Sequence, residues 1–169
     1  ANILRSSMAG TGVYKSTDGG KSFQHMGLTD TQHVSRIRIH PTNPDIVYVA
    51  SAGHEYTFTP DRGVYKTTDG GATWPMISTL AFIDLEFKPG DPTTLYGSTE
   101  GWNTTSIYLS TNSGASWGSG PVASYAGRRT ELAVSYNQPT WVYALVANTS
   151  GGLLGVYKST NSGASYALV

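Results

Sequence analysis

The sequence predicts an all-β fold made of repeated four-stranded blades, arranged as part of a β-propeller. Two observations support this prediction: a twelve-residue segment that occurs four times, and a strand pair that recurs between its copies. Equivalent positions in the four segments are Ser16, Thr67, Ser110 and Ser159, so the spacings are 51, 43 and 49 residues. A period in this range is typical of stacked supersecondary units that bury their apolar faces against one another.

Each copy of the twelve-residue segment is predicted to form a β-hairpin. In the first copy, residues 13–16 form a strand, residues 18–20 the turn, and residues 22–23 open the returning strand. Asp and Asn accept hydrogen bonds from nearby backbone amides, and Gly supplies a positive φ, so these residue types favour tight turns. The three later copies occupy residues 63–74, 106–117 and 155–166.

The segments between the hairpins each contain a strand, a turn that carries proline, and a second strand. They occupy residues 36–50, 84–98 and 131–145. Each period therefore contains four strands in meander order, A to D, with the repeated hairpin at the C–D turn.

This pattern divides the chain into about 3.75 blades. The predicted boundaries are 1–34 for a first blade that lacks strand A, then 35–79, 80–122 and 123–169. Residues 3–6 would be strand B of the first blade. Propellers close with about four to eight blades, so we expect the remaining blades to come from the same longer chain or from a partner.

The composition excludes several classes of function. Charged residues make up 13% of the chain and the formal net charge is zero, so no basic surface for nucleic acid is expected. There is no cysteine, and no apolar run long enough to span a membrane. No cofactor or metal is expected, because no zinc-ligand spacing occurs among the dispersed histidines His25, His33, His40 and His54.

The four hairpins resemble the Asp-box, or bacterial neuraminidase repeat, whose pattern is Ser/Thr-x-Asp-x-Gly-x-Thr/Ser-aromatic. The companion strand pairs resemble the blades of sortilin-type and xyloglucanase-type propellers and of secreted bacterial surface proteins. The resemblance implies an extracellular protein, secreted or at the cell surface, in which the box is a structural turn remote from the ligand. The residues assigned to folding in this way are Asp18, Gly20, Phe23, Asp69, Gly71, Trp74, Asn112, Gly114, Trp117, Asn161, Gly163 and Tyr166.

Charged residues alternate along the predicted A strands, which are innermost in a propeller. Arg36 and Arg38 correspond to Asp84 and Glu86 of the next blade. In the last blade, Glu131 occupies the position that corresponds to Asp84. Opposite charges at equivalent sites of neighbouring blades predict ion pairs that fix blade register. A catalytic role for one of these carboxylates remains an alternative.

Ligand contacts are expected on the rim formed by the B–C and D–A loops, opposite the hairpin turns, because loops on a rigid scaffold commonly carry function. The candidate ligand-binding residues are Tyr56, Trp102, Tyr125 and Arg128. The candidate catalytic carboxylates are Glu55, Asp61 and Glu100, since glycoside hydrolysis generally requires a carboxylate pair.

Two kinds of function fit these observations. The first is a secreted or cell-surface propeller that binds or scaffolds a glycan or a protein. The alternative is part of the catalytic module of a glycoside hydrolase of the xyloglucanase or sialidase type. A receptor-like propeller that captures peptides in its channel is a third possibility.

Overall fold

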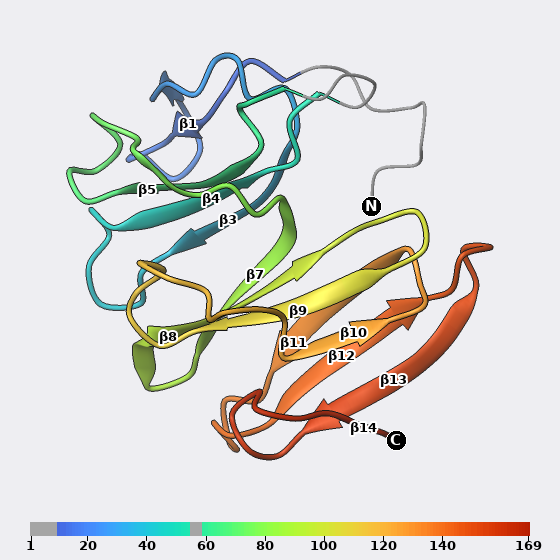
Figure 1. The fold of residues 1–169 in the computed structure, drawn as a ribbon. Coiled ribbons are helices and arrows are strands. Elements are labelled where there is room, and N and C mark those ends of the chain that lie inside the picture. The colour runs from blue at the N-terminus through green and yellow to red at the C-terminus, as the bar shows by residue number, and fades with distance from the viewer. Residues whose placement is uncertain (1–9, 55–58) are drawn as a thin grey trace.

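The predicted all-β architecture is confirmed. A computed structural model describes residues 10–54 and 59–169, and these residues form antiparallel sheets without any helix. Figure 1 shows the sheets stacked one after another, from the blue-green sheet at the upper left to the orange-red sheet at the lower right. We call the sheets blades 1 to 4 in chain order.

Blade 1 is represented by one hairpin, β1 (Tyr14–Lys15) paired with β2 (Gln24–His25). The returning strand therefore begins at Gln24 and not at Ser22, as the sequence had suggested. The reason is that the Asp18 carboxylate accepts hydrogen bonds from the Ser22 amide and hydroxyl, which holds Ser22 within the turn. The predicted strand at residues 3–6 lies outside the described residues.

Blades 2 to 4 each contain four strands in the predicted meander order. Blade 2 consists of β3 (Val34–Ile39), β4 (Val47–Ser51), β5 (Gly63–Thr67) and β6 (Met76–Ser78). Blade 3 consists of β7 (Phe82–Lys88), β8 (Asp91–Thr99), β9 (Thr105–Ser110) and β10 (Ala123–Tyr125). Blade 4 consists of β11 (Arg129–Val134), β12 (Val142–Ala147), β13 (Leu153–Ser159) and β14 (Ala167–Leu168).

The predicted boundary between residues 122 and 123 needs correction. Residues 123–125 form β10, which pairs with β9 and so belongs to blade 3. The segment after the third hairpin contains Gly118, Gly120 and Pro121, and this longer connection delays the start of the fourth strand. The first boundary moves by one residue, because β3 begins at Val34.

The core lies between the blades, because successive side chains of a strand point to opposite faces. In β4, Tyr48 and Ala50 pack toward Phe82 of blade 3, whereas Val49 packs with Val13 of blade 1. All five are buried, and full burial of a large apolar side chain contributes about 1.5–3 kcal/mol. Blade 2 thus shares a buried core with each of its two neighbours.

Candidate functional site

The four repeated hairpins, here called box hairpins, are held by closely similar hydrogen bonds. In the first, the Ser16 hydroxyl donates to Asp18 Oδ1 over 2.8 Å and accepts from the Gly20 amide over 2.8 Å. Asp18 Oδ1 also accepts the amides of Lys21 and Ser22, each over 3.0 Å. These side chains thus accept hydrogen bonds from backbone amides that have no backbone partner in the turn.

The boxes with Asp and those with Asn differ in one hydrogen bond. In the second box the Thr73 hydroxyl donates to Asp69 Oδ2 over 2.6 Å. In the third box the direction is reversed, since the Asn112 amide donates to Ser116 Oγ over 2.8 Å. A hydroxyl either donates or accepts, so both residue types close the same turn.

These hydrogen bonds also keep the box carboxylates ionised. Bonds from the side chain and backbone of Ser22 and from Ser16 lower the pKa of Asp18 from 3.8 to about 2. The pKa of Asp69 is lowered in the same way, by the hydroxyls of Thr67 and Thr73 and the amide of Thr73. Both oxygens of each carboxylate thereby accept hydrogen bonds within the turn, which supports a structural role.

In the second, third and fourth boxes, the aromatic residue that ends the box packs against the preceding blade. Trp74 Nε1 donates to the Met26 carbonyl of blade 1 over 2.7 Å. Trp117 is buried in the core shared with blade 2, and Tyr166 packs in the core shared with blade 3. Phe23, which ends the first box, is 64% exposed.

The charged residues of the innermost strands form the predicted interblade ion pairs. Arg36 of β3 contacts Asp84 of β7, and its second nitrogen lies 3.5 Å from Glu131 of β11. Arg38 pairs with Glu86 of β7. Three neighbouring blades are therefore tied together along their inner strands.

Asp84 is the centre of this network. Its side chain is fully buried, and one carboxylate oxygen accepts from Arg36 and from the Leu85 amide. The other oxygen accepts from the Leu132 amide of blade 4 over 2.8 Å. Because both oxygens are occupied by hydrogen-bond donors, Asp84 acts as a structural link between blades. The sequence aligned Asp84 with the arginine but gave no sign of the bond to Leu132.

Glu86 differs from Asp84 in its electrostatics. Burial raises the pKa of Glu86, and the hydrogen bond from Arg38 opposes that rise. Its ion pair with Arg38 gives it the same interblade role. The alternative of a catalytic carboxylate on these strands thus has no support from the contacts of Asp84 or Glu86.

The rim opposite the box hairpins carries an exposed aromatic platform. Trp102 is 74% exposed, and the Arg128 guanidinium lies 4.8 Å from the centre of its ring. Trp102 follows β8 of blade 3 and Arg128 precedes β11 of blade 4, so the platform crosses two blades. A cation over the ring face stabilises this arrangement.

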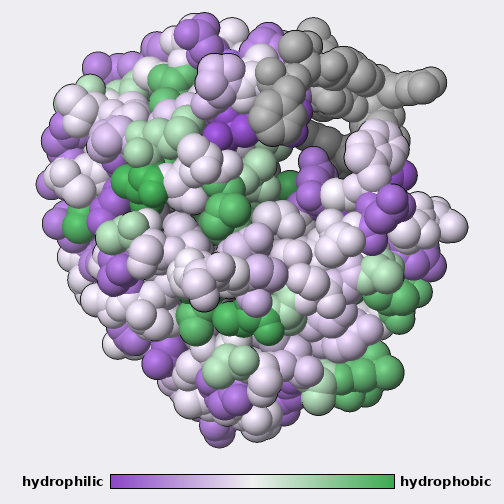
Figure 2. Space-filling model, viewed as in Figure 1, coloured by the Kyte–Doolittle hydropathy of each residue, from purple (hydrophilic) through white to green (hydrophobic). Residues whose placement is uncertain are grey.

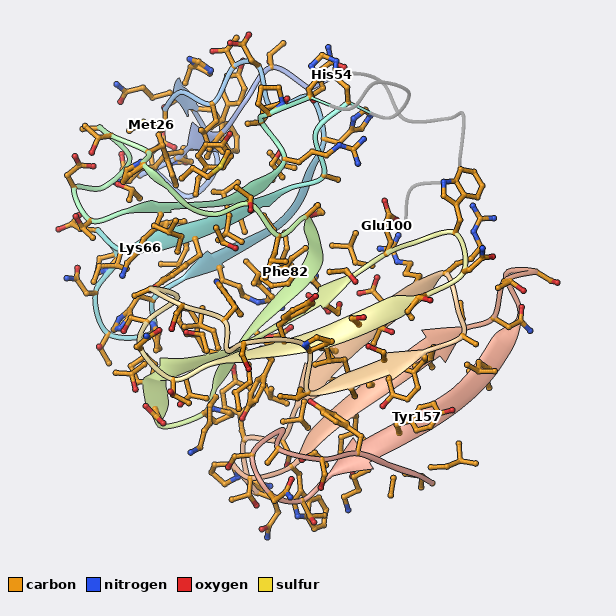
Figure 3. The ribbon with its side chains drawn as sticks, in the orientation of Figure 1. Met26, His54, Lys66, Phe82, Glu100 and Tyr157 are labelled. Atoms are coloured by element: carbon orange, nitrogen blue, oxygen red, sulfur yellow. The ribbon has the colours of Figure 1, made fainter. Side chains whose placement is uncertain are left out.

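Glu100 lies beside this platform at the end of β8. Its backbone forms an isolated bridge with Arg129, and the next amide, Gly101, donates to the Arg128 carbonyl over 2.9 Å. The Glu100 side chain is exposed and has no hydrogen bond or ion pair within residues 10–54 and 59–169. Figure 3 shows Glu100 and His54 toward the same end of the molecule, away from Lys66. Glu100 is thus a carboxylate available to a ligand.

The other predicted site residues have different positions. Asp61 is half-buried, and its Oδ2 atom is buried without a hydrogen-bond partner in the described part of the chain. Tyr125 is not on a loop: it lies in β10, its ring packs 4.2 Å from that of Tyr157, and its hydroxyl is buried. Its expected ligand contact is therefore corrected to a role in the interblade core. Glu55 and Tyr56 lie outside the described residues.

An open groove of about 640 Å³ lies between β6 and the connection after the third box. Its lining includes Met76, Tyr108 and Trp117, but no carboxylate, histidine or basic side chain among the described residues. It offers no acid–base chemistry.

Within residues 10–54 and 59–169 no cluster of ligands could hold a metal ion, and no helix could cross a bilayer.

Comparisons with known proteins find one similar sequence and several similar folds. No protein-family model matches the chain. Over 116 residues, 64% of the chain, it is 31% identical to a xyloglucanase of Hypocrea jecorina (strain QM6a), of which this stretch is 12%.

Three solved structures share the fold over 96% of the chain. An ancestral GH74 enzyme matches with a TM-score of 0.72 at 20% identity, the chain covering 22% of it. A GH74 xyloglucanase of Xanthomonas campestris matches with a TM-score of 0.70 at 16% identity and 28% coverage. A GH74 enzyme of Niastella koreensis matches with a TM-score of 0.67 at 19% identity and 27% coverage. The chain thus spans about an eighth to a quarter of the length of these proteins.

Proposed function

We propose that this chain is a segment of a glycoside-hydrolase propeller of the xyloglucanase type, and that its rim forms part of the cleft for the polysaccharide. The observation that carries the proposal is the 31% identity with a xyloglucanase over 116 residues. The likeness in fold to GH74 enzymes over 96% of the chain supports it. The glycoside-hydrolase alternative is thereby better supported than a scaffold that only binds.

The chemistry of the rim agrees with a sugar ligand. Trp102 offers a flat apolar ring of the kind that stacks on a pyranose, and Arg128 fixes the orientation of that ring. Glu100, two residues before Trp102, has an exposed carboxylate with no hydrogen bond or ion pair in the described part of the chain. A polymeric substrate would be met outside the cell, which agrees with secretion of the protein.

Hydrolysis requires a second carboxyl group across the scissile bond. Asp84 and Glu86 are held by Arg36 and Arg38, and Arg129 Nε donates to Glu131 over 2.6 Å. We therefore assign Glu100 as one carboxylate of the pair and expect the other from a blade outside this chain.

The first test measures binding of xyloglucan to the 169-residue chain. Trp102→Ala is expected to weaken binding at least tenfold, about 1.4 kcal/mol. Phe23→Ala is the matched control, because it removes an exposed aromatic ring from a box hairpin, and it should bind like the parent. Equal binding by both variants would contradict the assignment of the rim.

The second test measures hydrolysis by the longer protein that contains this segment. Glu100→Gln should abolish turnover while xyloglucan binding persists. Binding without turnover in the unaltered longer protein would instead favour the interpretation as a binding module. Turnover that survives Glu100→Gln would remove Glu100 from the pair.

A further inference from the structure

We propose that the groove between blades 2 and 3 is a binding site of its own, which takes one unit of a neutral sugar chain. It is separate from the rim, because its walls are β6 and the connection between β9 and β10. Both walls come from blades that have all four strands. The proposal is independent of the proposed function, since it rests on a difference between two contacts inside the molecule and on the chemistry of the groove.

The contact surfaces between successive blades, here called seams, are alike in one polar contact. A lysine of the third strand donates to the carbonyl of the second turn residue in the next box. Lys15 reaches the Gly70 carbonyl over 3.2 Å at the seam between blades 1 and 2. Lys66 reaches the Ser113 carbonyl over 3.3 Å at the seam between blades 2 and 3. The two seams therefore hold the next box in the same way.

The tryptophan that ends the box distinguishes these two seams. Trp74 Nε1 donates to the Met26 carbonyl across the first of them. Trp117 lines the groove at the second, and its Nε1 atom is buried without a hydrogen-bond partner in the described part of the chain. An unpaired buried donor is unfavourable, so a ligand oxygen that enters the groove and reaches this N–H group gains a hydrogen bond that the protein does not supply.

A longer connection after the third box forms one wall of the groove. In blade 2, β6 begins at Met76, two residues after Trp74. In blade 3, β10 begins at Ala123, six residues after Trp117. Residues 118–120 of this longer connection line the groove. The extra length thus builds a wall that the shorter connection of blade 2 does not provide.

The described lining of the groove has no charged side chain but carries several hydroxyl groups. Ser78 Oγ and Ser116 Oγ each accept a hydrogen bond from the protein, over 3.1 and 2.8 Å, so each hydroxyl keeps its proton to donate. Thr79 and Ser119 are exposed and make no hydrogen bond within residues 10–54 and 59–169. A neutral ligand with oxygen acceptors can use all four hydroxyls.

Apolar surface lies beside these hydroxyls. Met76, Leu80 and Tyr108 line the groove and are partly buried, and the Tyr108 ring packs 5.7 Å from that of Phe82. Figure 2 shows hydrophobic side chains among pale and hydrophilic ones on the face seen in Figure 1. The volume of about 640 Å³ lies within the range of small-molecule sites, about 300–1,000 Å³.

A sugar unit combines the two properties that this lining requires. Its C–H groups pack on aromatic and aliphatic carbon, while its ring oxygen and hydroxyls exchange hydrogen bonds with hydroxyl groups and an indole N–H. An ionic ligand would lose its hydration without meeting an opposite charge in the described lining. The groove therefore favours a neutral sugar.

The experiment follows the indole N–H signals by NMR while xyloglucan heptasaccharide or cellotetraose is added to the Trp102→Ala variant of the 169-residue chain. The chain has four tryptophans, so this variant removes the rim indole and leaves three signals, and Trp117→Phe assigns that of Trp117. We expect one or both sugars to shift the Trp117 signal, which identifies the sugar chain. The signal of Trp74, whose N–H group is already bonded, should stay in place.

The same titration measures the contribution of the hydroxyls. The double variant Thr79→Ala/Ser119→Ala should raise the dissociation constant about tenfold, because two hydrogen bonds to the ligand are lost. Thr17→Ala/Thr160→Ala is the matched control, since these threonines are exposed in the first and fourth boxes and make no hydrogen bond in the described part of the chain. It should leave the dissociation constant unchanged.

Deletion of residues 118–121 gives the third box the connection length of the second and should abolish the shift. The other indole signals report whether this variant is folded, and the double variant tests the site without a change in the backbone. A Trp117 signal that stays in place with both sugars, or that shifts equally with anionic tetragalacturonate, would overturn the proposal. A shift caused only by an apolar peptide, acetyl-trileucine amide, would also overturn it.

Discussion

Within each box, one hydroxyl and one carbonyl-bearing side chain make the turn, and the glycine two residues later gives it room. Ser16 and Asp18 bond to each other and accept hydrogen bonds from the amides of residues 20–22, and Gly20 adopts a φ of 87°. The side-chain bonds follow from the residue types alone, which is why the sequence predicted the hairpins correctly. The start of the returning strand was predicted too early, because the reach of Asp18 to the Ser22 amide depends on the folded turn.

Titration of the Asp boxes should weaken the fold in acid. Their pKa values are lowered from 3.8, so their stabilisation is complete well above that pH and is lost as the pH falls through 3.8 toward the lowered values. Asp69→Asn should retain the melting temperature near pH 7, since Asn112 closes the same turn, and should flatten its fall between pH 4 and 2. The measurement is thermal unfolding across that range. Asn112→Asp, the reverse change, should steepen the fall; parallel curves for all three proteins would be inconsistent with this assignment.

The glycines of the boxes allow a matched test of interblade contact. Gly20→Ala should cost about 1–2 kcal/mol, because a residue other than glycine is strained at positive φ. Gly114→Ala should cost about 1–3 kcal/mol more, since its Cβ atom would also press on Ile77 and Tyr48. Urea unfolding of dilute protein measures both free energies. Equal losses of unfolding free energy would mean that the contact between blades 2 and 3 accommodates the added Cβ atom without a free-energy cost.

Among the elements, the seams between blades are where sequence patterns and structure agree least. The strand that became β4 was predicted from the sequence, but which of its faces meets which neighbour was not. Tyr125 illustrates the difficulty: its position near a predicted loop suggested the rim, whereas pairing of β10 with β9 turns the ring toward Tyr157. The length of the preceding connection decides that pairing, and no local pattern encodes it.

One hydrogen bond across the second seam can be removed without altering its shape. Tyr48→Phe deletes the donor to the Ser113 carbonyl, which keeps its bond from Lys66. The expected loss of unfolding free energy is about 1 kcal/mol. Tyr136→Phe, at a side chain that is 83% exposed, should change it by less than about 0.5 kcal/mol. A loss at Tyr48 no larger than that at Tyr136 would show that the bond contributes nothing.

At the scale of the whole molecule, the inner strands are connected through Asp84. The sequence predicted the opposite charges of Arg36 and Asp84, since equivalent positions of neighbouring blades align. It placed Trp102 and Arg128 on one rim, and the structure brings them together. The partner of Glu100 could not be predicted, because a site formed across a ring depends on blades beyond this segment.

Asp84→Asn tests whether this link holds the blades together. It leaves the half-buried Arg36 guanidinium without its closest counter-charge, and the expected loss is about 3–5 kcal/mol. Glu131→Gln is the control, because Glu131 lies farther from Arg36 and is 37% exposed, so its loss should be at most about 1 kcal/mol. Guanidinium unfolding of both variants decides the matter; comparable losses would refute a central role for Asp84.

The lysine contact also distinguishes one seam from another. Blades 1 and 2 present Lys15 and Lys66 to the next box, but Leu109 stands at the same position in blade 3, whose seam with blade 4 is lined by Tyr96, Tyr125 and Tyr166. Burial raises the pKa of Tyr96 to about 12. This seam carries uncharged tyrosine hydroxyls where the other two carry a lysine ammonium group. The blades are therefore alike in fold but not interchangeable in position. The order of the blades is encoded in pairwise chemistry, so a duplicated or transposed blade would meet the wrong neighbour.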